Sequence, residues 1–126
     1  MPLHNLDQRA AQYAQKIVAN GQDGLGNLIT KTLGVLQEQG VYACLLFLFS
    51  RTSNEKILAD NTIRPHLYNL LKELPVFADK EITDQNALQF FADTVCNDLD
   101  TLLLVKELYE QTLIYSRYGA KAEGKQ

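Results

Sequence analysis

The chain contains little glycine and proline, with seven and three residues among 126. So small a share excludes a collagen-like repeat and a low-complexity chain. An apolar fraction of 46% with 21% charged residues also excludes a wholly disordered protein. A chain of this length corresponds to one domain, and it can bury enough surface to fold without a metal or a disulfide. We therefore expect a single domain over residues 1–126.

Long apolar segments are also absent. The longest uninterrupted apolar run, Val41–Phe49, has nine residues, whereas a membrane-spanning helix needs about 20. The segment Met1–Arg9 lacks the charged-then-apolar pattern of a signal peptide. The only two cysteines, Cys44 and Cys96, each have apolar neighbours. We therefore expect a cytoplasmic protein in which both thiols are reduced and act as small buried groups.

The net charge of −3 is distributed unevenly along the chain. Residues 1–78 carry seven basic and six acidic side chains, a net of +1. Residues 79–110 carry two basic and eight acidic side chains, a net of −6, and residues 111–126 carry three basic and one acidic, a net of +2. This acidic total disfavours a protein that binds duplex DNA through a broad basic surface. A local basic stripe on the N-terminal half is compatible with it.

Apolar residues recur every three or four positions through most of the chain, which is the pattern of amphipathic helices. The pattern predicts helices over residues 6–18, 25–39, 55–60, 62–74, 84–96 and 99–118. Asn5 is the candidate N-cap of the first helix, and Gly40 fits the position that follows the second. Thr83 or Asp84 is the candidate cap of the fifth, and residues 119–126 are expected to fray.

The run Val41–Phe49 has no period, so its spacing does not distinguish a helix from a strand. No second strand candidate exists to pair with it, and an isolated strand would leave its backbone polar groups unsatisfied. We therefore expect a helix that is buried on most sides. The sequence predicts an all-α fold, a compact bundle of six to seven helices with no confident strand.

The sequence carries no pattern typical of a catalytic or metal site. His4 and His66 are isolated, and neither Cys-x-x-Cys nor His-x-x-x-His occurs. Asp98 and Asp100 lack the glycine and glutamate of a calcium loop, and on a helix they point about 200° apart. The glycine-rich stretch Gly21–Gly26 follows a helix and lacks the Lys-Ser/Thr of a phosphate loop. We expect no enzymatic activity, no metal and no cofactor.

Five basic side chains are the candidate binding residues. Arg9, Lys16 and Lys31 are expected on the outer faces of the first two helices, while Arg51 and Lys56 flank the polar break after the apolar run. If they converge, they would contact a nucleic-acid backbone without reading its sequence. Several copies of the chain along one strand would then bind more tightly than one. The competing interpretation is a set of scattered charges that keep the protein in solution.

Three stretches resemble the small subunit of the Cmr complex, the type III-B CRISPR effector. Residues 6–14 resemble the opening helix of that family, and residues 40–48 resemble its Gly-Leu dipeptide followed by a small-and-aromatic buried helix. Residues 114–122 resemble its closing helix, which is aromatic, then basic, then rich in alanine. Val41 stands where the family usually has leucine, and Tyr115 stands where tryptophan is common.

The resemblance implies a helical bundle without catalytic activity that stacks on further copies of itself in an RNA-targeting complex. It implies contact with other CRISPR effector subunits and, through the backbone, with guide and target RNA. It assigns phosphate contact to Arg9, Lys16, Arg51 and Lys56, with Lys31 as the weakest match. Cleavage of the target RNA would belong to a neighbouring subunit. Two alternatives are the small subunit of a type III-A complex and an unrelated helical adaptor that binds only protein.

Overall fold

The computed structural model describes residues 3–126, with side chains from Leu6 onward. As predicted, this part of the chain is all-α and contains no strand. Its α-helices are α1 (Leu3–Ala19), α2 (Leu25–Gln39), α3 (Val41–Phe49), α4 (Ser53–Leu58), α5 (Arg64–Leu71), α6 (Ala87–Phe90) and α7 (Leu99–Ala122). Two π-helical turns, Ala59–Ile63 and Phe91–Val95, and a 3₁₀ turn, Pro75–Phe77, complete the helical elements.

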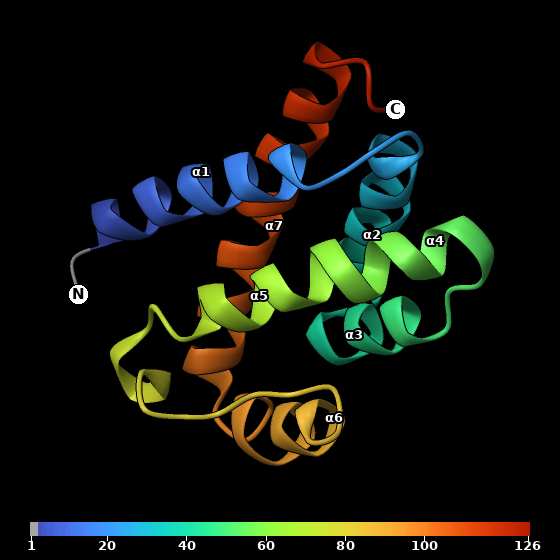
Figure 1. Ribbon diagram of the computed structural model, residues 1–126. Coiled ribbons are helices and arrows are strands. Elements are labelled where there is room, and N and C mark those ends of the chain that lie inside the picture. Colours follow the sequence, from blue (N-terminus) through green and yellow to red (C-terminus); the bar gives the residue numbers. More distant parts are fainter. Residues whose placement is uncertain (1–2) are drawn as a thin grey trace.

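Helix α7 is the central element of the bundle (Figure 1). It packs mainly against α1 and α2, which form the most extensive helix pairs with it. Helices α4 and α5 form one continuous rod that crosses α7, and α3 and α6 lie below this rod in the view of Figure 1. The helices from the two ends of the sequence, α1 and α7, therefore pack together.

The predicted apolar stripes of the first two helices are buried, which confirms both. The buried side chains of α1 are at most 7% exposed, and those of α2 are at most 2% exposed. These side chains share one buried face of each helix because the apolar spacing of three and four matches the helical repeat. The residues are Leu6, Ala10, Tyr13, Ala14, Ile17 and Val18 of α1, and Leu25, Leu28, Ile29, Thr32, Leu33 and Leu36 of α2.

Gly40 joins α2 directly to α3 without a loop. Its backbone has φ of 98° and ψ of −175°, a region that is essentially restricted to glycine. The run Val41–Phe49 is helical as predicted, and Leu46 is its only exposed residue. Cys44 is buried and Cys96 is half-buried, and burial raises the pKa of the Cys44 thiol to about 12.

Two predicted helices, over residues 55–60 and 62–74, are one continuous helical segment. The π-helical turn Ala59–Ile63 links α4 to α5, and the Arg64 N–H donates to the Ala59 carbonyl across it. The prediction of a break was wrong because Asp60 pairs with Lys56 and Arg64, one turn before and one turn after it in the same segment. The Thr62 hydroxyl in addition donates to the Asn20 carbonyl (3.2 Å). The wider turn ends two residues before Pro65, whose missing N–H would interrupt a regular hydrogen-bond ladder at this position.

Two helix starts also differ from the prediction. Helix α1 begins at Leu3, so Asn5 lies within the helix and not at its cap, and the side chain of Asn5 is outside the described residues. Helix α6 begins at Ala87 because the preceding segment forms a turn, in which the Thr83 N–H donates to Asn86 Oδ1 (2.9 Å). Ala92, expected to face inward, is exposed on the following π-helical turn.

The expected fraying of residues 119–126 is contradicted by the structure. Helix α7 continues to Ala122, and the residues after it hydrogen-bond to the junction between α1 and α2. The Gly26 and Asn27 N–H groups donate to the carbonyls of Lys125 (2.9 Å) and Gln126 (3.0 Å), and Lys125 Nζ donates to the Val18 carbonyl (2.8 Å). These contacts satisfy backbone groups that helix ends leave without partners, and this holds the segment in place.

Candidate nucleic-acid interface

Lys31 and Arg51 meet at one carboxylate, that of Glu55. Lys31 Nζ of α2 lies 2.8 Å from Glu55 Oε2, and Arg51 Nη1 lies 3.3 Å from Glu55 Oε1. Hydrogen bonding to Lys31 lowers the pKa of Glu55, and partial burial opposes this shift. The charge of Lys31 and the hydrogen bond and charge of Arg51 lower the pKa further. Two cations therefore share one anion on the surface between α2 and α4, and this group of three residues keeps an excess positive charge.

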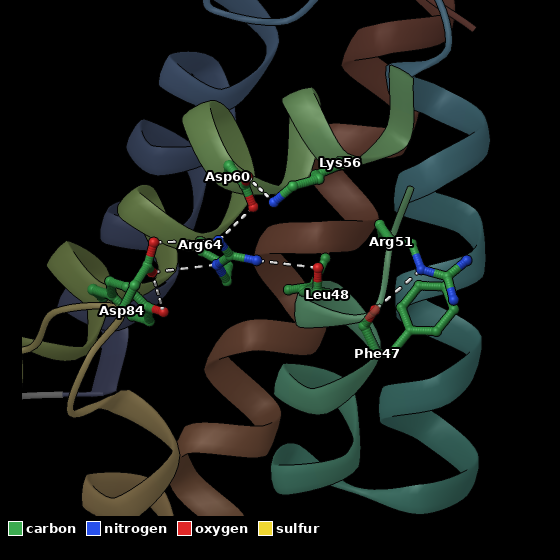
Figure 2. A network of polar contacts seen from close by, with 8 residues as sticks. Phe47, Leu48, Arg51, Lys56, Asp60, Arg64 and Asp84 are labelled. Carbon is green, nitrogen blue, oxygen red and sulfur yellow. Dashed lines mark hydrogen bonds and ion pairs between the residues drawn. The ribbon is translucent and has the colours of Figure 1, made fainter. Parts of the chain in front are cut away.

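The position of Arg51 is fixed by the end of α3 (Figure 2). Arg51 Nε donates to the Phe47 carbonyl (3.0 Å), which also accepts from the Ser50 N–H (3.1 Å) and the Ser50 hydroxyl (2.7 Å) at the end of α3. The guanidinium group also lies over the Phe47 ring, 3.8 Å from its centroid. A planar cation held in this way presents its remaining N–H groups in a fixed orientation.

Lys56 belongs to a neighbouring ion-pair network. Lys56 Nζ lies 2.7 Å from Asp60 Oδ2, and the other oxygen of Asp60 accepts a hydrogen bond from Arg64. Partial burial raises the pKa of Asp60, but hydrogen bonds and charge from Lys56 and Arg64 outweigh it and leave the pKa lowered. Lys56 is exposed, so it is the member of this network that can reach a ligand.

Arg64 was not among the predicted residues, and it links three parts of the fold (Figure 2). Its side chain is only 4% exposed. It donates to the Leu48 carbonyl (3.1 Å) and to both oxygens of Asp84 (3.2 and 3.3 Å), and it stacks over the Phe49 ring. The signal in the sequence is its spacing, because Leu67, Tyr68 and Leu71 follow it at offsets that place all four on one helix face.

Arg9 and Lys16 form a separate group on α1. Arg9 Nε lies 3.0 Å from Glu73 Oε1, and the Tyr13 hydroxyl donates to Glu73 Oε2 (3.0 Å). Lys16 Nζ lies 4.3 Å from the centroid of the Tyr13 ring. Partial burial, together with Glu73, raises the pKa of Tyr13 to about 12. Among the described residues, no hydrogen bond or ion pair joins the side chains of this group to those around Glu55.

The five predicted cations therefore differ in what surrounds them. Arg9, Lys31, Arg51 and Lys56 each pair with a carboxylate, and Lys16 pairs with an aromatic ring. A phosphate group would have to compete with these carboxylates, so each contact contributes less than a contact to an unpaired cation would. The structure brings Lys31 and Arg51 together at the carboxylate of Glu55, and Lys56 follows Glu55 directly in the sequence.

The residues that could support other chemistry are dispersed. Across residues 6–126, no three His, Cys, Asp or Glu side chains are grouped so that they could hold a metal ion. His66 Nδ1 lies 2.6 Å from the Thr62 carbonyl, one turn earlier in the same helical segment, and His4 lies outside the described side chains. Within the described chain, every helix is too short or too polar to cross a membrane.

Comparisons of the chain with protein-family models, with curated proteins and with solved structures found no significant match. A functional hypothesis therefore depends on the residues and on the fold. The relevant features are an all-α bundle, the cations around Glu55 and the separate group on α1.

Proposed function

We propose that this protein is a non-catalytic structural subunit of a type III-B CRISPR RNA-targeting complex in the cytoplasm. In this proposal it stacks with further copies along the guide–target RNA duplex, and it contacts the RNA backbone and the other effector subunits. The observation that carries the proposal is the position of the three stretches that resemble the Cmr small subunit. They coincide with α1, with the Gly40 junction that opens α3, and with the last turns of α7.

The cations support the RNA-contacting part of the proposal. Lys31, Arg51 and Lys56 lie on adjacent elements, and their flexible or stacked side chains can exchange a carboxylate for a phosphate. One such exchange gains little, because the ion pair that it replaces is lost. A row of identical subunits along one RNA strand multiplies the weak contacts through effective concentration. The proposed role therefore needs an assembly and not tight binding by one copy.

One alternative also has a supporting observation. Leu99 and Leu103 lie one turn apart on α7 and are 66% and 53% exposed, which suits contact with a protein. An adaptor that binds only protein would use such a surface and would not need RNA. The type III-A small subunit is the other alternative, and it differs in the subunits that would accompany the protein.

The test is affinity purification of the tagged protein from its native host at low salt. We expect co-purification of a short guide RNA together with type III-B subunits. Type III-A subunits would favour the type III-A small subunit, protein partners without RNA would favour the adaptor, and recovery of the protein alone would contradict the proposal.

A matched pair of variants tests the cations in the same experiment. The triple substitution K31Q, R51Q and K56Q should lower the yield of target RNA retained by the complex. The triple substitution K72Q, K80Q and K106Q changes the net charge by the same amount at other positions and should retain it. Equal retention by the two variants would remove the Glu55 group from the proposal.

A further inference from the structure

A hollow of about 300 Å³ lies between the first half of α2 and the last turns of α7. Asn27 and Thr30 of α2 form one wall, and Arg117, Tyr118 and Lys121 of α7 form the other. Docking of the chain end on α2 closes one side of the hollow, because Gln126 also lines it. The C-terminal segment that was expected to fray therefore helps to shape this site.

The charge of the hollow distinguishes it from the rest of the described surface. Four other hollows there each have at least one aspartate or glutamate in the wall, whereas this one has none. Arg117 and Lys121 lie four residues apart, and neither forms an ion pair with a carboxylate of the described residues. An anion can bind to these two side chains without displacing an ion pair, in contrast to the surface around Glu55.

The second feature is an aromatic ring beside the cations. Tyr118 is 65% exposed, and the Arg117 guanidinium lies 5.6 Å from the centroid of its ring. Exposed aromatic rings next to arginine are the usual platform on which unpaired bases stack. The opposite wall is polar, since Asn27 is exposed and the Thr30 hydroxyl donates to the Gly26 carbonyl and retains lone pairs that can accept.

We propose that this hollow binds one nucleotide unit of single-stranded RNA. Arg117 and Lys121 hold the phosphate, and the ring of Tyr118 stacks on the base. An acidic peptide is the less suitable ligand, because its carboxylates would use the cations and leave the exposed ring without a partner. Two observations, the unpaired cations and the exposed ring, therefore point to the same ligand class.

The location relates this site to the cations already described. Asn27 and Thr30 also line the hollow that contains Lys31 and Glu55, so the two hollows flank the same exposed face of α2. A strand that crosses α2 would reach both. The inference rests on the proposed function because both involve RNA. It adds a site that binds an unpaired base.

Binding of a short fluorescent oligouridine to the purified full chain, measured by anisotropy over a range of salt concentrations, tests the site. The double substitution R117Q and K121Q should lower the affinity about tenfold, and it should reduce the slope of log K against log salt by about 1.4, since each phosphate contact on a single strand contributes about 0.7. The substitution Y118L should lower the affinity about fivefold or more with the salt slope unchanged. Circular dichroism would verify that each variant is folded.

The matched control is the double substitution K72Q and K80Q, which removes the same charge elsewhere and should change the affinity less than twofold. An equal loss in the control would show general electrostatic attraction and would overturn the site. Displacement of the RNA by polyglutamate, together with full affinity of Y118L for RNA, would show a site for acidic peptides and would also overturn the proposal. A wild-type protein that does not bind the oligouridine would overturn it as well.

Crosslinking separates this inference from the proposed function. RNA that contains 4-thiouridine should form a crosslink to the peptide that includes Tyr118, identified by mass spectrometry. A complex that co-purifies with guide RNA but gives no such crosslink would overturn the site alone. A crosslink at Tyr118 in a protein that co-purifies with no CRISPR subunit would overturn the proposed function alone.

Discussion

Replacing Arg64 with alanine is expected to lower the free energy of unfolding by about 3 kcal/mol, and three contributions add up to this figure. The Leu48 carbonyl would be left without its side-chain donor, which costs about 1 kcal/mol or more for a buried acceptor. The stack on the Phe49 ring would be lost, at about 1 kcal/mol. The carboxylates of Asp60 and Asp84 would lose their shared partner.

The carboxylate contribution is the smallest per group, because both acids can recover water. The side chain of Asp60 is 27% exposed and that of Asp84 is 45% exposed. A fully buried pair that loses one partner costs about 3–5 kcal/mol, whereas an exposed pair contributes less than about 1 kcal/mol. We therefore assign about 1 kcal/mol to the two acids together.

Urea unfolding followed by circular dichroism would measure this loss. A domain of this size is expected to unfold in one cooperative step, so the midpoint should shift while the dependence on urea stays constant. Lys56→Ala is the control, since Lys56 pairs with the same Asp60 but is 61% exposed, and it should cost less than about 0.5 kcal/mol. A loss below about 1 kcal/mol for Arg64→Ala, or an equal loss for both variants, would refute the view that this guanidinium holds α3, α5 and the Asp84 segment together.

Three further predictions concern other parts of the fold. Gly40→Ala should cost about 2 kcal/mol, because alanine is strained at a φ of 98°. Gly34→Ala, inside α2, should stabilise by about 0.5–1 kcal/mol, because the added carbon meets no atom within 4 Å beyond its own stretch of helix. Equal effects in thermal unfolding would contradict the assignment of strain. The pKa of Glu55 is lowered in the folded state from its ordinary 4.5, so its stabilising effect should be complete above pH 4.5 and should be lost as the pH falls through the folded value. In urea unfolding at several pH values, Glu55→Gln should weaken this acid dependence, and an unchanged dependence would count against the ion pairs. A thiol reagent should modify Cys96 in the native protein and Cys44 only after unfolding, since Cys44 is 1% exposed; two thiols that react equally fast would show a more open core.

The parts of the fold that the sequence predicted correctly are those that repeat locally. The stripes of α1 and α2 and the stop at Gly40 depend on neighbours three and four residues away, so the pattern is visible in the chain itself. The π-helical turn was missed because Asp60 and Asn61 read as a polar break. The spacing by four of Ala59, Ile63, Leu67 and Leu71 gives no signal of the wider turn, because a regular helix shows the same spacing.

The contacts that depend on tertiary structure were beyond sequence reasoning. The cations around Glu55 could be named, but the pairing of Lys31 with Glu55 joins residues 24 positions apart. The attachment of the C-terminal segment uses the backbone carbonyls of Lys125 and Gln126, and a backbone group has no signature in the sequence. Arg117 and Lys121 were not among the candidate residues, although two cations four residues apart on a helix can be recognised without a structure.

The π-helical turn at Ala59–Ile63 has a consequence for how this chain can change in length. A π-helical turn holds one residue more than the α-helical turn that it replaces, so deletion of a single residue from this turn would leave a regular α-helix with α5 in nearly the same rotation relative to α4. The guanidinium of Arg64 would then keep its place beside Leu48 and Asp84. A homologue that is one residue shorter here is therefore expected to retain the arginine, whereas a deletion within α4 or α5 would turn the side chains beyond it by about 100°.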